Sequence, residues 1–330
     1  MIITRTPFRI SFAGGGTDLR SFYVAEPGRV ISASINKFIY VVIKRQIGIV
    51  EHKYRINWSK VEFTNSIDEI EHPIVREALK LFHIDFPIEI TTFTDVPGQT
   101  GLGSSSAFAV GLVHALHALK GEMVTKHTLA KEAAFIEVDL LERIMGKQDH
   151  YASAYGNINV FTFTKDEVVK VDPVLYRPEI LKKVESNLLL FYLRTKRNAS
   201  EILRSQDANT EVCRENLRNL QRLVDPIRDV FNGTLELDKL GEILDEGWQI
   251  KRKLSNDVSS SEIDDYYYKA MSAGALGGKV LGAGGGGFLL FYVKEDKQLA
   301  VKKALSNLFQ MPVLFDNAGS RITYYDGSMV

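Results

Sequence analysis

The 330-residue sequence has little cysteine, no long apolar run and no net charge, and each shortage excludes a class of protein. The single cysteine, Cys213, cannot form an intramolecular disulfide, which favours a reducing compartment. No apolar run approaches the ~20 residues of a membrane-spanning helix. Residues 1–16 lack the layout of a signal peptide because polar and charged residues interrupt them throughout. We therefore expect a cytoplasmic protein that binds no membrane.

The charges are balanced, with 41 basic and 41 acidic residues, which argues against a general nucleic-acid binder. Hydrophobic residues make up 45% of the chain, enough for two domains that each bury a core. Predicted strands and helices alternate in both halves, as in an α+β fold. Pro173 and Pro178 bracket the predicted boundary, so we assign residues 1–175 and 176–330 to the two domains.

A glycine- and serine-rich loop at residues 95–106 carries the strongest chemical signal. A predicted strand at 87–94 precedes it, and an apolar helix at 107–119 follows. The loop's glycines permit backbone conformations that a Cβ would forbid, so several N–H groups can face one anion at the helix N-terminus. Its serines can cap the helix, bind phosphate oxygen or reach Mg²⁺. A Walker P-loop is excluded because no Lys precedes the serines. A plain connection with a serine cap remains the alternative.

Two other glycine-rich segments flank predicted strands. A strand at 2–12 leads into three glycines and Asp18, whose carboxylate can accept hydrogen bonds from two adjacent sugar hydroxyls. The alternative for Asp18 is a turn residue that caps the next segment. Residues 277–293 predict a strand, a glycine turn and a second strand. The four glycines at 284–287 indicate close backbone packing against a ligand or the other domain.

Charged residues in three further segments are candidates for chemistry. Residues 125–142 predict a helix that contains Glu137. Asp149 ends the segment Gly-Lys-Gln-Asp, and as a bare sequence feature it is more typical of a turn. Lys196 and Arg197 belong to a basic cluster just before a helix predicted to begin near Ala199. This cluster is either a second anion site or a solvated basic loop.

Three segments together resemble the signatures of the GHMP small-molecule kinases. Residues 97–107 (PGQTGLGSSSA) resemble the second signature, residues 7–19 (PFRISFAGGGTDL) the N-terminal one, and residues 279–288 (KVLGAGGGGF) the C-terminal one. Within the family, AGGGTDL and GKQDHYASAYG are most similar to the D-glycero-D-manno-heptose 7-phosphate kinases. The resemblance implies an N-terminal domain like domain 2 of ribosomal protein S5, a ferredoxin-like C-terminal domain, and the use of ATP and Mg²⁺.

The resemblance also implies roles for individual residues. Asp149 would orient or deprotonate the acceptor hydroxyl, and Arg9 would stabilise the charge of the transferred phosphoryl group. Ser105 and Glu137 would hold the metal, and the nearby Asp139 and Glu142 are read as solvated helix charges. The ATP phosphates would bind at Gly98, Gly101, Leu102, Gly103, Ser104, Ser105 and Ser106. The substrate would bind at Gly15, Gly16, Thr17, Asp18, Lys196, Arg197, Gly284 and Gly285.

The reaction implied is phosphorylation of the anomeric hydroxyl of D-glycero-D-manno-heptose 7-phosphate to the 1,7-bisphosphate. Gly15 and Gly16 replace the Glu-His pair of galactokinases, which leaves room for a bulkier sugar. One alternative is a 1-kinase for an unphosphorylated sugar such as fucose or galactose, which would not need Lys196 and Arg197. Another is a catalytically silent sensor of ATP and sugar, against which Arg9 and Asp149 argue. A homodimer is compatible with the sequence.

Overall fold

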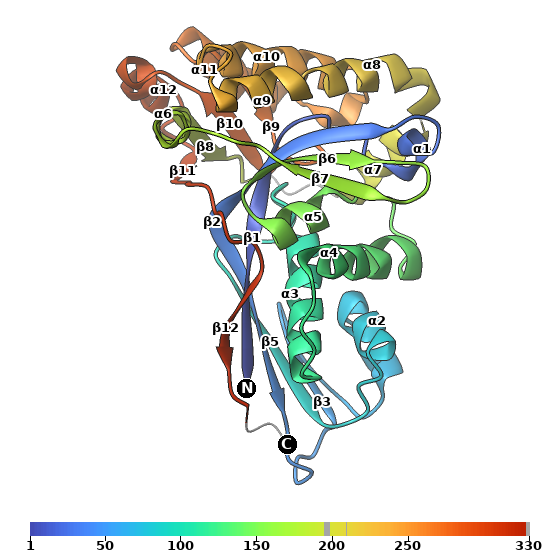
Figure 1. The fold of residues 1–330 in the computed structure, drawn as a ribbon. Helices are drawn as coiled ribbons and strands as arrows, with labels where there is room; N and C mark the ends of the chain where they lie inside the picture. The colour runs from blue at the N-terminus through green and yellow to red at the C-terminus, as the bar shows by residue number, and fades with distance from the viewer. Residues whose placement is uncertain (195–198, 209, 328–330) are drawn as a thin grey trace.

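The computed structural model describes residues 1–194, 199–208 and 210–327, so the predicted anion site at Lys196 and Arg197 lies outside the described residues. The chain forms two sheets with helices packed on them (Figure 1), so the predicted α+β architecture is confirmed. No helix within the described ranges is both long and apolar enough to cross a membrane.

The larger sheet has eight strands in the order β12-β1-β2-β5-β3-β4, with β6 paired to β2 and β7 paired to β6. The long strand β2 divides this sheet, because residues 39–45 pair with β5 and residues 28–33 pair with β6. All pairs are antiparallel except β3 with β5. The strands are β1 (Ile2–Ala13), β2 (Gly28–Arg45), β3 (Tyr54–Asn57), β4 (Val61–Thr64), β5 (Ile88–Thr94), β6 (Ile158–Phe163), β7 (Val169–Pro173) and β12 (Arg321–Tyr325).

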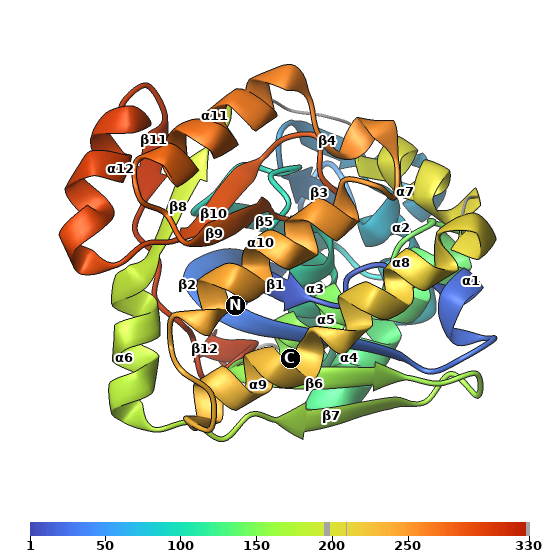
Figure 2. The same ribbon diagram turned by 90° about the horizontal axis from the view of Figure 1, so that it is seen from above.

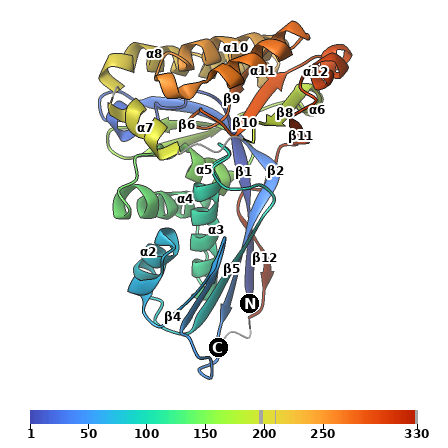
Figure 3. The same cartoon turned by 180° about the vertical axis from the view of Figure 1, so that it is seen from behind.

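Helices α2 (Pro73–Leu81), α3 (Ser104–Leu119), α4 (Lys126–Ala134) and α5 (Gln148–Tyr155) lie on one side of this sheet (Figure 3). Helix α3 is apolar almost all round and packs closely on β1, where the Thr4 hydroxyl donates to the Gly111 carbonyl at 2.9 Å. A Cβ on Gly111 would lie 2.9 Å from Thr6 Oγ1, so glycine permits this approach. The approach fixes the N-terminus of α3 beside the middle of β1.

The helix predicted at 125–142 forms in two parts. Helix α4 ends at Ala134, and a π-helical turn, η2 (Phe135–Leu140), continues it. π-Helical turns are rare and occur mostly at functional sites. This turn carries Glu137, whose side chain is fully buried. Short helices α1 (Arg20–Tyr23) and η1 (Ile67–Glu69) complete this half.

The second sheet has four antiparallel strands, β11 (Phe309–Met311), β8 (Leu188–Tyr192), β10 (Phe288–Tyr292) and β9 (Gly277–Val280), in that order. Helices α8 to α11 extend over the top of the molecule (Figure 2). The remaining elements are α6 (Pro178–Asn187), α7 (Ala199–Ala208), α8 (Thr210–Arg222), α9 (Val224–Asn232), α10 (Lys239–Lys251), η3 (Asn256–Val258), α11 (Ser261–Ser272), η4 (Glu295–Lys297) and α12 (Gln298–Ala304).

The C-terminal strand returns to the first sheet. Strand β12 pairs with β1, placing Tyr325 opposite Ile2. The division at residues 175 and 176 stays a prediction, and the structure adds that the end of the second segment joins the sheet of the first. The start of β1 and the end of β12 therefore lie side by side (Figure 1).

Candidate active site

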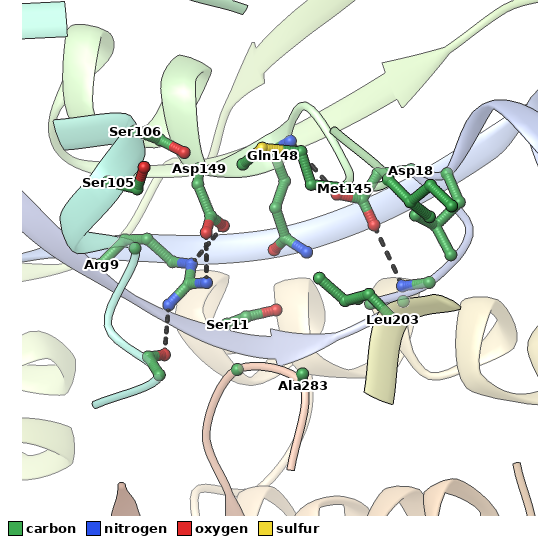
Figure 4. Close-up of a pocket in the computed structure, with 18 of the residues that line it drawn as sticks. Arg9, Ser11, Asp18, Ser105, Ser106, Met145, Gln148, Asp149, Leu203 and Ala283 are labelled. Atoms are coloured by element: carbon green, nitrogen blue, oxygen red, sulfur yellow. Dashed lines mark hydrogen bonds and ion pairs between the residues drawn. The ribbon is translucent and has the colours of Figure 1, made fainter. Parts of the chain in front are cut away.

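A cavity of about 420 Å³ lies between the two halves of the molecule. Its walls come from β1 and the glycine turn that follows it, the loop before α3, and the N-terminus of α5. Helix α10 and the glycine turn between β9 and β10 close the other side. Figure 4 shows the polar side chains that point into this space.

A largely buried ion pair joins β1 to α5 in the cavity wall. Arg9 Nε and Nη2 donate to the two carboxylate oxygens of Asp149, each at 2.6 Å, and Arg9 Nη1 donates to the Gly101 carbonyl at 2.7 Å. The side chain of Arg9 is 5% exposed and that of Asp149 16% exposed. The bidentate geometry fixes the orientation of both groups (Figure 4). A carboxylate held in this way can orient or deprotonate a hydroxyl in the cavity.

The glycine loop before α3 is fitted tightly between its neighbours. Gly103 has φ +77° and caps α3, and a Cβ there would lie 3.1 Å from Asp149 Oδ2. A Cβ on Gly101 would lie 2.5 Å from the Leu281 carbonyl, and one on Gly282 would lie 2.5 Å from the Gly101 Cα. The glycine loops of the two halves therefore touch backbone to backbone beside the ion pair. Any side chain at these positions would force them apart.

A second polar cluster lies at the N-terminus of α3. The Ser105 hydroxyl donates to Glu137 Oε1, and Arg143 Nη1 contacts both Ser105 Oγ and the same carboxylate oxygen. His150 Nε2 lies 2.9 Å from Glu137 Oε2, with both side chains fully buried. Burial would raise the pKa of Glu137, but hydrogen bonds from His150 and Ser105 and the charge of Arg143 outweigh it and lower that pKa. Glu137 is therefore held as a carboxylate.

The carboxylate of Asp18 faces the same cavity from the turn after β1. It accepts hydrogen bonds from the Gly16 N–H at 3.0 Å and the Gln148 N–H at 3.2 Å. Burial and the negative charge of Asp149 raise the pKa of Asp18 despite these bonds. A Cβ on Gly146 would fall 1.8 Å from Asp18 Oδ2, so glycine is required there. Because a buried carboxylate without a cation needs donors, this group suits a ligand rich in hydroxyls.

Two buried lysines add positive charge on the opposite wall. Lys279 Nζ, on β9, donates to the carbonyls of Ser11 and Phe12 at 2.9 and 2.8 Å. Lys251 Nζ, at the end of α10, donates to the Gly282 carbonyl. Burial and the charge of Arg9 lower the pKa of Lys251 to about 8, and burial with the charges of Lys251 and Arg9 lowers that of Lys279 further. This excess of buried cations favours an anionic ligand.

The structure brings most of the sequence-predicted residues to this cavity and leaves some elsewhere. Leu102 is buried in the core, and its carbonyl accepts the Arg9 N–H at 3.1 Å. The Thr17 hydroxyl is used within the turn, donating to the Gly14 carbonyl at 2.8 Å. Gly98 is exposed, whereas Gly284 and Gly285 pack against Val258. The predicted residues that line the cavity are Arg9, Gly15, Gly16, Asp18, Gly101, Gly103, Ser104, Ser105, Ser106, Glu137 and Asp149.

Several residues of the site were not predicted from the sequence. His150 holds Glu137 from the position next to Asp149, and its contact with the helix turn at 135–140 is not visible in the sequence. Arg143 and Gln148 lie within a few residues of predicted site residues, so proximity in sequence was an available signal for them. Lys279 is the first residue of the C-terminal signature at 279–288, although the glycines carried the signal there. Lys251 carried no local signal, because its burial depends on packing between distant segments.

Two family models match the chain. Residues 73–157 match the model for the N-terminal domain of GHMP kinases, and residues 234–310 match the model for the C-terminal domain of GHMP kinases. The first match covers the glycine loop, Glu137 and Asp149, and the second covers Lys251, Lys279 and the glycine turn after β9.

Individual relatives match over nearly the whole chain. D-glycero-alpha-D-manno-heptose 7-phosphate kinase of Campylobacter jejuni is 28% identical over 92% of this chain and 93% of its own length. A galactokinase of Thermotoga neapolitana is 23% identical over 93% of each chain. Among solved structures, a D-glycero-D-manno-heptose 1-phosphate kinase from Bacteriodes thetaiotaomicron superimposes with a TM-score of 0.80. That match has 24% identity and covers 99% of this chain and all of the other.

Proposed function

Because the chain belongs to the GHMP kinases, ATP-dependent phosphotransferases with an alcohol group as acceptor, we propose that it phosphorylates the anomeric hydroxyl of D-glycero-D-manno-heptose 7-phosphate. The product would be the 1,7-bisphosphate. The choice of sugar is supported by the 28% identity with the Campylobacter jejuni kinase over almost the full length of both chains. The two-domain fold expected from the sequence is that of the family.

The observation that carries the proposal is the Arg9–Asp149 pair facing Asp18 across one cavity. Phosphoryl transfer depends mainly on positioning and on stabilising negative charge. In the proposed reaction, Asp18 holds the sugar, and Asp149 orients the acceptor hydroxyl and accepts its proton as the oxygen attacks. The leaving group is ADP. Arg9 lies beside the transferred group, where its fixed charge stabilises the negative oxygens.

The ATP phosphates fit the loop at 101–106. Gly103 is the N-cap of α3, so the free N–H groups of this helix N-terminus face the cavity together with the serines. Lys251 and Lys279 supply further positive charge from the other half of the molecule. A bound triphosphate would supply the negative charge that these buried cations need as a partner.

The Ser105 hydroxyl and the Glu137 carboxylate are suitable ligands for Mg²⁺. Within the described ranges, no group of three or more His, Cys, Asp or Glu side chains could hold a metal ion. A hydroxyl and one buried carboxylate nevertheless suffice for Mg²⁺, because phosphate oxygens and waters complete its octahedron. Such an ion would neutralise charge on the phosphates. Arg143 now contacts both oxygens, so its guanidinium would have to move aside for a metal ion. The homodimer and the cytoplasmic location stay predictions.

The test compares ADP release with heptose 7-phosphate, the free heptose, galactose and fucose, using ATP and Mg²⁺. We expect kcat/KM to be at least ~100-fold higher with heptose 7-phosphate, because a bound phosphate group adds charge-assisted hydrogen bonds. Phosphorus NMR of the product should show a new phosphate on the anomeric carbon. A preference for a free sugar would refute this substrate and favour a hexose 1-kinase. Absence of turnover with every sugar would favour a sensor.

A further inference from the structure

Three polar side chains that line the cavity have buried atoms without hydrogen-bond partners: Ser106 in the first turn of α3, and two others outside the glycine loop. Ser11 Oγ, on β1, and Gln148 Oε1, at the first residue of α5, are both inaccessible to solvent and unpaired. Ser11 is 6% exposed and Gln148 8% exposed. A buried polar atom left unpaired costs free energy, so native proteins pair nearly all of them. These two atoms therefore indicate a ligand that supplies the missing partners.

The two side chains converge on one point. A Cβ built on Gly15 would lie 3.7 Å from Gln148 Nε2 and 3.8 Å from Ser11 Oγ. The absence of a side chain at Gly15 thus leaves a space bordered by both groups. Figure 4 shows Gln148 reaching from α5 toward β1, between Asp149 and Asp18. A ligand that touches both carboxylates must pass Gln148 on the way.

The backbone positions of both residues are fixed by their neighbours. The Gln148 N–H donates to Asp18, and the next residue, Asp149, is held by Arg9. Ser11 follows Arg9 by two residues on the same strand, so both side chains project from the same face of β1. The Ser11 carbonyl is held by Lys279 Nζ at 2.9 Å. Each of the two elements therefore presents one charged and one neutral polar group to the cavity.

We propose that Ser11 and Gln148 bind hydroxyl groups of the sugar ring and determine which epimer is accepted. A primary amide offers both an acceptor and a donor, so it can bond two neighbouring hydroxyls at once. A serine hydroxyl donates or accepts according to the group that faces it. A sugar whose hydroxyl points the other way would leave these buried atoms unpaired, which is a strong basis for discrimination. This inference rests on the proposed function and adds specificity determinants to it.

The test uses Ser11→Ala and Gln148→Met, which remove the polar atoms with little change in volume. The reference sugar is whichever compound the wild type phosphorylates fastest, compared with its epimers that differ at a single hydroxyl. We expect kcat/KM for the reference sugar to fall about 10-fold for each lost hydrogen bond. The fall in kcat/KM for at least one epimer should be smaller, so the ratio of kcat/KM between the reference sugar and that epimer should decrease. The Michaelis constant for ATP should not change.

Two further measurements separate this role from a structural one. The unfolding temperature of each variant without ligands should equal or exceed that of the wild type, because the removed atoms have no partner to lose. If both groups bind one sugar, the double variant should show a coupling energy in a double-mutant cycle. Gln310→Met on β11 and Ser306→Ala, an exposed position, make the same changes outside the cavity. They should leave kcat/KM unchanged.

The possible failures are distinguishable. If the best sugar is not heptose 7-phosphate, the substrate proposal fails, and Ser11 and Gln148 are still tested with the sugar that replaces it. If both variants lose activity equally with every epimer, or lose stability without ligands, the specificity role is refuted. Wild type that phosphorylates no sugar at all would refute both proposals.

Discussion

Replacing Asp149 by Asn tests the central ion pair most directly. The change keeps the shape of the side chain but removes the negative charge that Arg9 Nε and Nη2 meet at 2.6 Å. We expect kcat to fall by ~100-fold or more, equal to about 2.7 kcal/mol of transition-state stabilisation, because the acceptor hydroxyl would lose the carboxylate proposed to orient or deprotonate it. Nucleotide affinity should be unchanged or higher, because Arg9 keeps its charge and loses its only carboxylate partner within the described residues.

The same substitution should also reduce stability. Arg9 is nearly buried, and removing one partner of a buried ion pair costs up to about 3–5 kcal/mol because the remaining charge is uncompensated. Single-turnover measurements with saturating sugar would give the chemical rate, calorimetry with ADP the nucleotide affinity, and denaturant unfolding the stability. Asp166→Asn, at an exposed position outside the cavity, is the matched control. A folded Asp149→Asn variant that turns over within threefold of the wild type would remove Asp149 from the mechanism.

Three other substitutions test separate parts of the site. Glu137→Gln should raise the Mg²⁺ concentration needed for half-maximal activity by ~10-fold or more, since a neutral amide is a weak Mg²⁺ ligand; an unchanged titration would exclude Glu137 as the metal ligand. Gly103→Ala should lower both stability and kcat, because φ is +77° and the added Cβ would meet Asp149 Oδ2 at 3.1 Å; a variant with wild-type unfolding and turnover would contradict the packing. Because the pKa of Lys251 is lowered to about 8, nucleotide binding above pH 8 should take up protons, measurable by calorimetry in buffers of different ionisation enthalpy; Lys251→Met should abolish this uptake. Unfolding returns the pKa of Lys251 toward its ordinary value of 10.5, so the unfolded chain binds more protons than the folded one between pH 8 and 10.5. The free energy of unfolding should therefore rise with pH through that window, because the destabilising effect of Lys251 decreases.

Local patterns predicted the elements that build the site. The alternation in residues 2–12, the glycine loop and the apolar stretch after it correspond to β1, the turn at Gly101 and Gly103, and α3. These predictions succeed because a strand period, a glycine that permits a positive φ and an apolar helix can each be recognised in a sequence window of about ten residues. The family resemblance supplied the roles, which local patterns alone left open for Asp18 and Asp149.

Features that depend on distant segments were not predicted. The pairing of the first part of β2 with β6 joins residues separated by more than a hundred positions, and no local pattern encodes such pairing. The π-helical turn around Glu137 follows from packing that a helical pattern cannot distinguish from an α-helix. Lys251 resembles any other charge on an amphipathic helix until α10 packs over the cavity. Burial by tertiary contacts decided each of these cases.

The return of β12 to the first sheet has a mechanical consequence. Residues 176–320 leave that sheet after β7 and rejoin it at β12, so the segment is tethered at both ends. A domain joined by one linker can rotate freely relative to its neighbour. A domain joined by two connections is restricted to smaller rotations about the axis through the two connection points. The two halves around the cavity would then open and close by a hinge-like rotation. The glycine loops at Gly101 and Gly282 would separate and come back into contact during this motion.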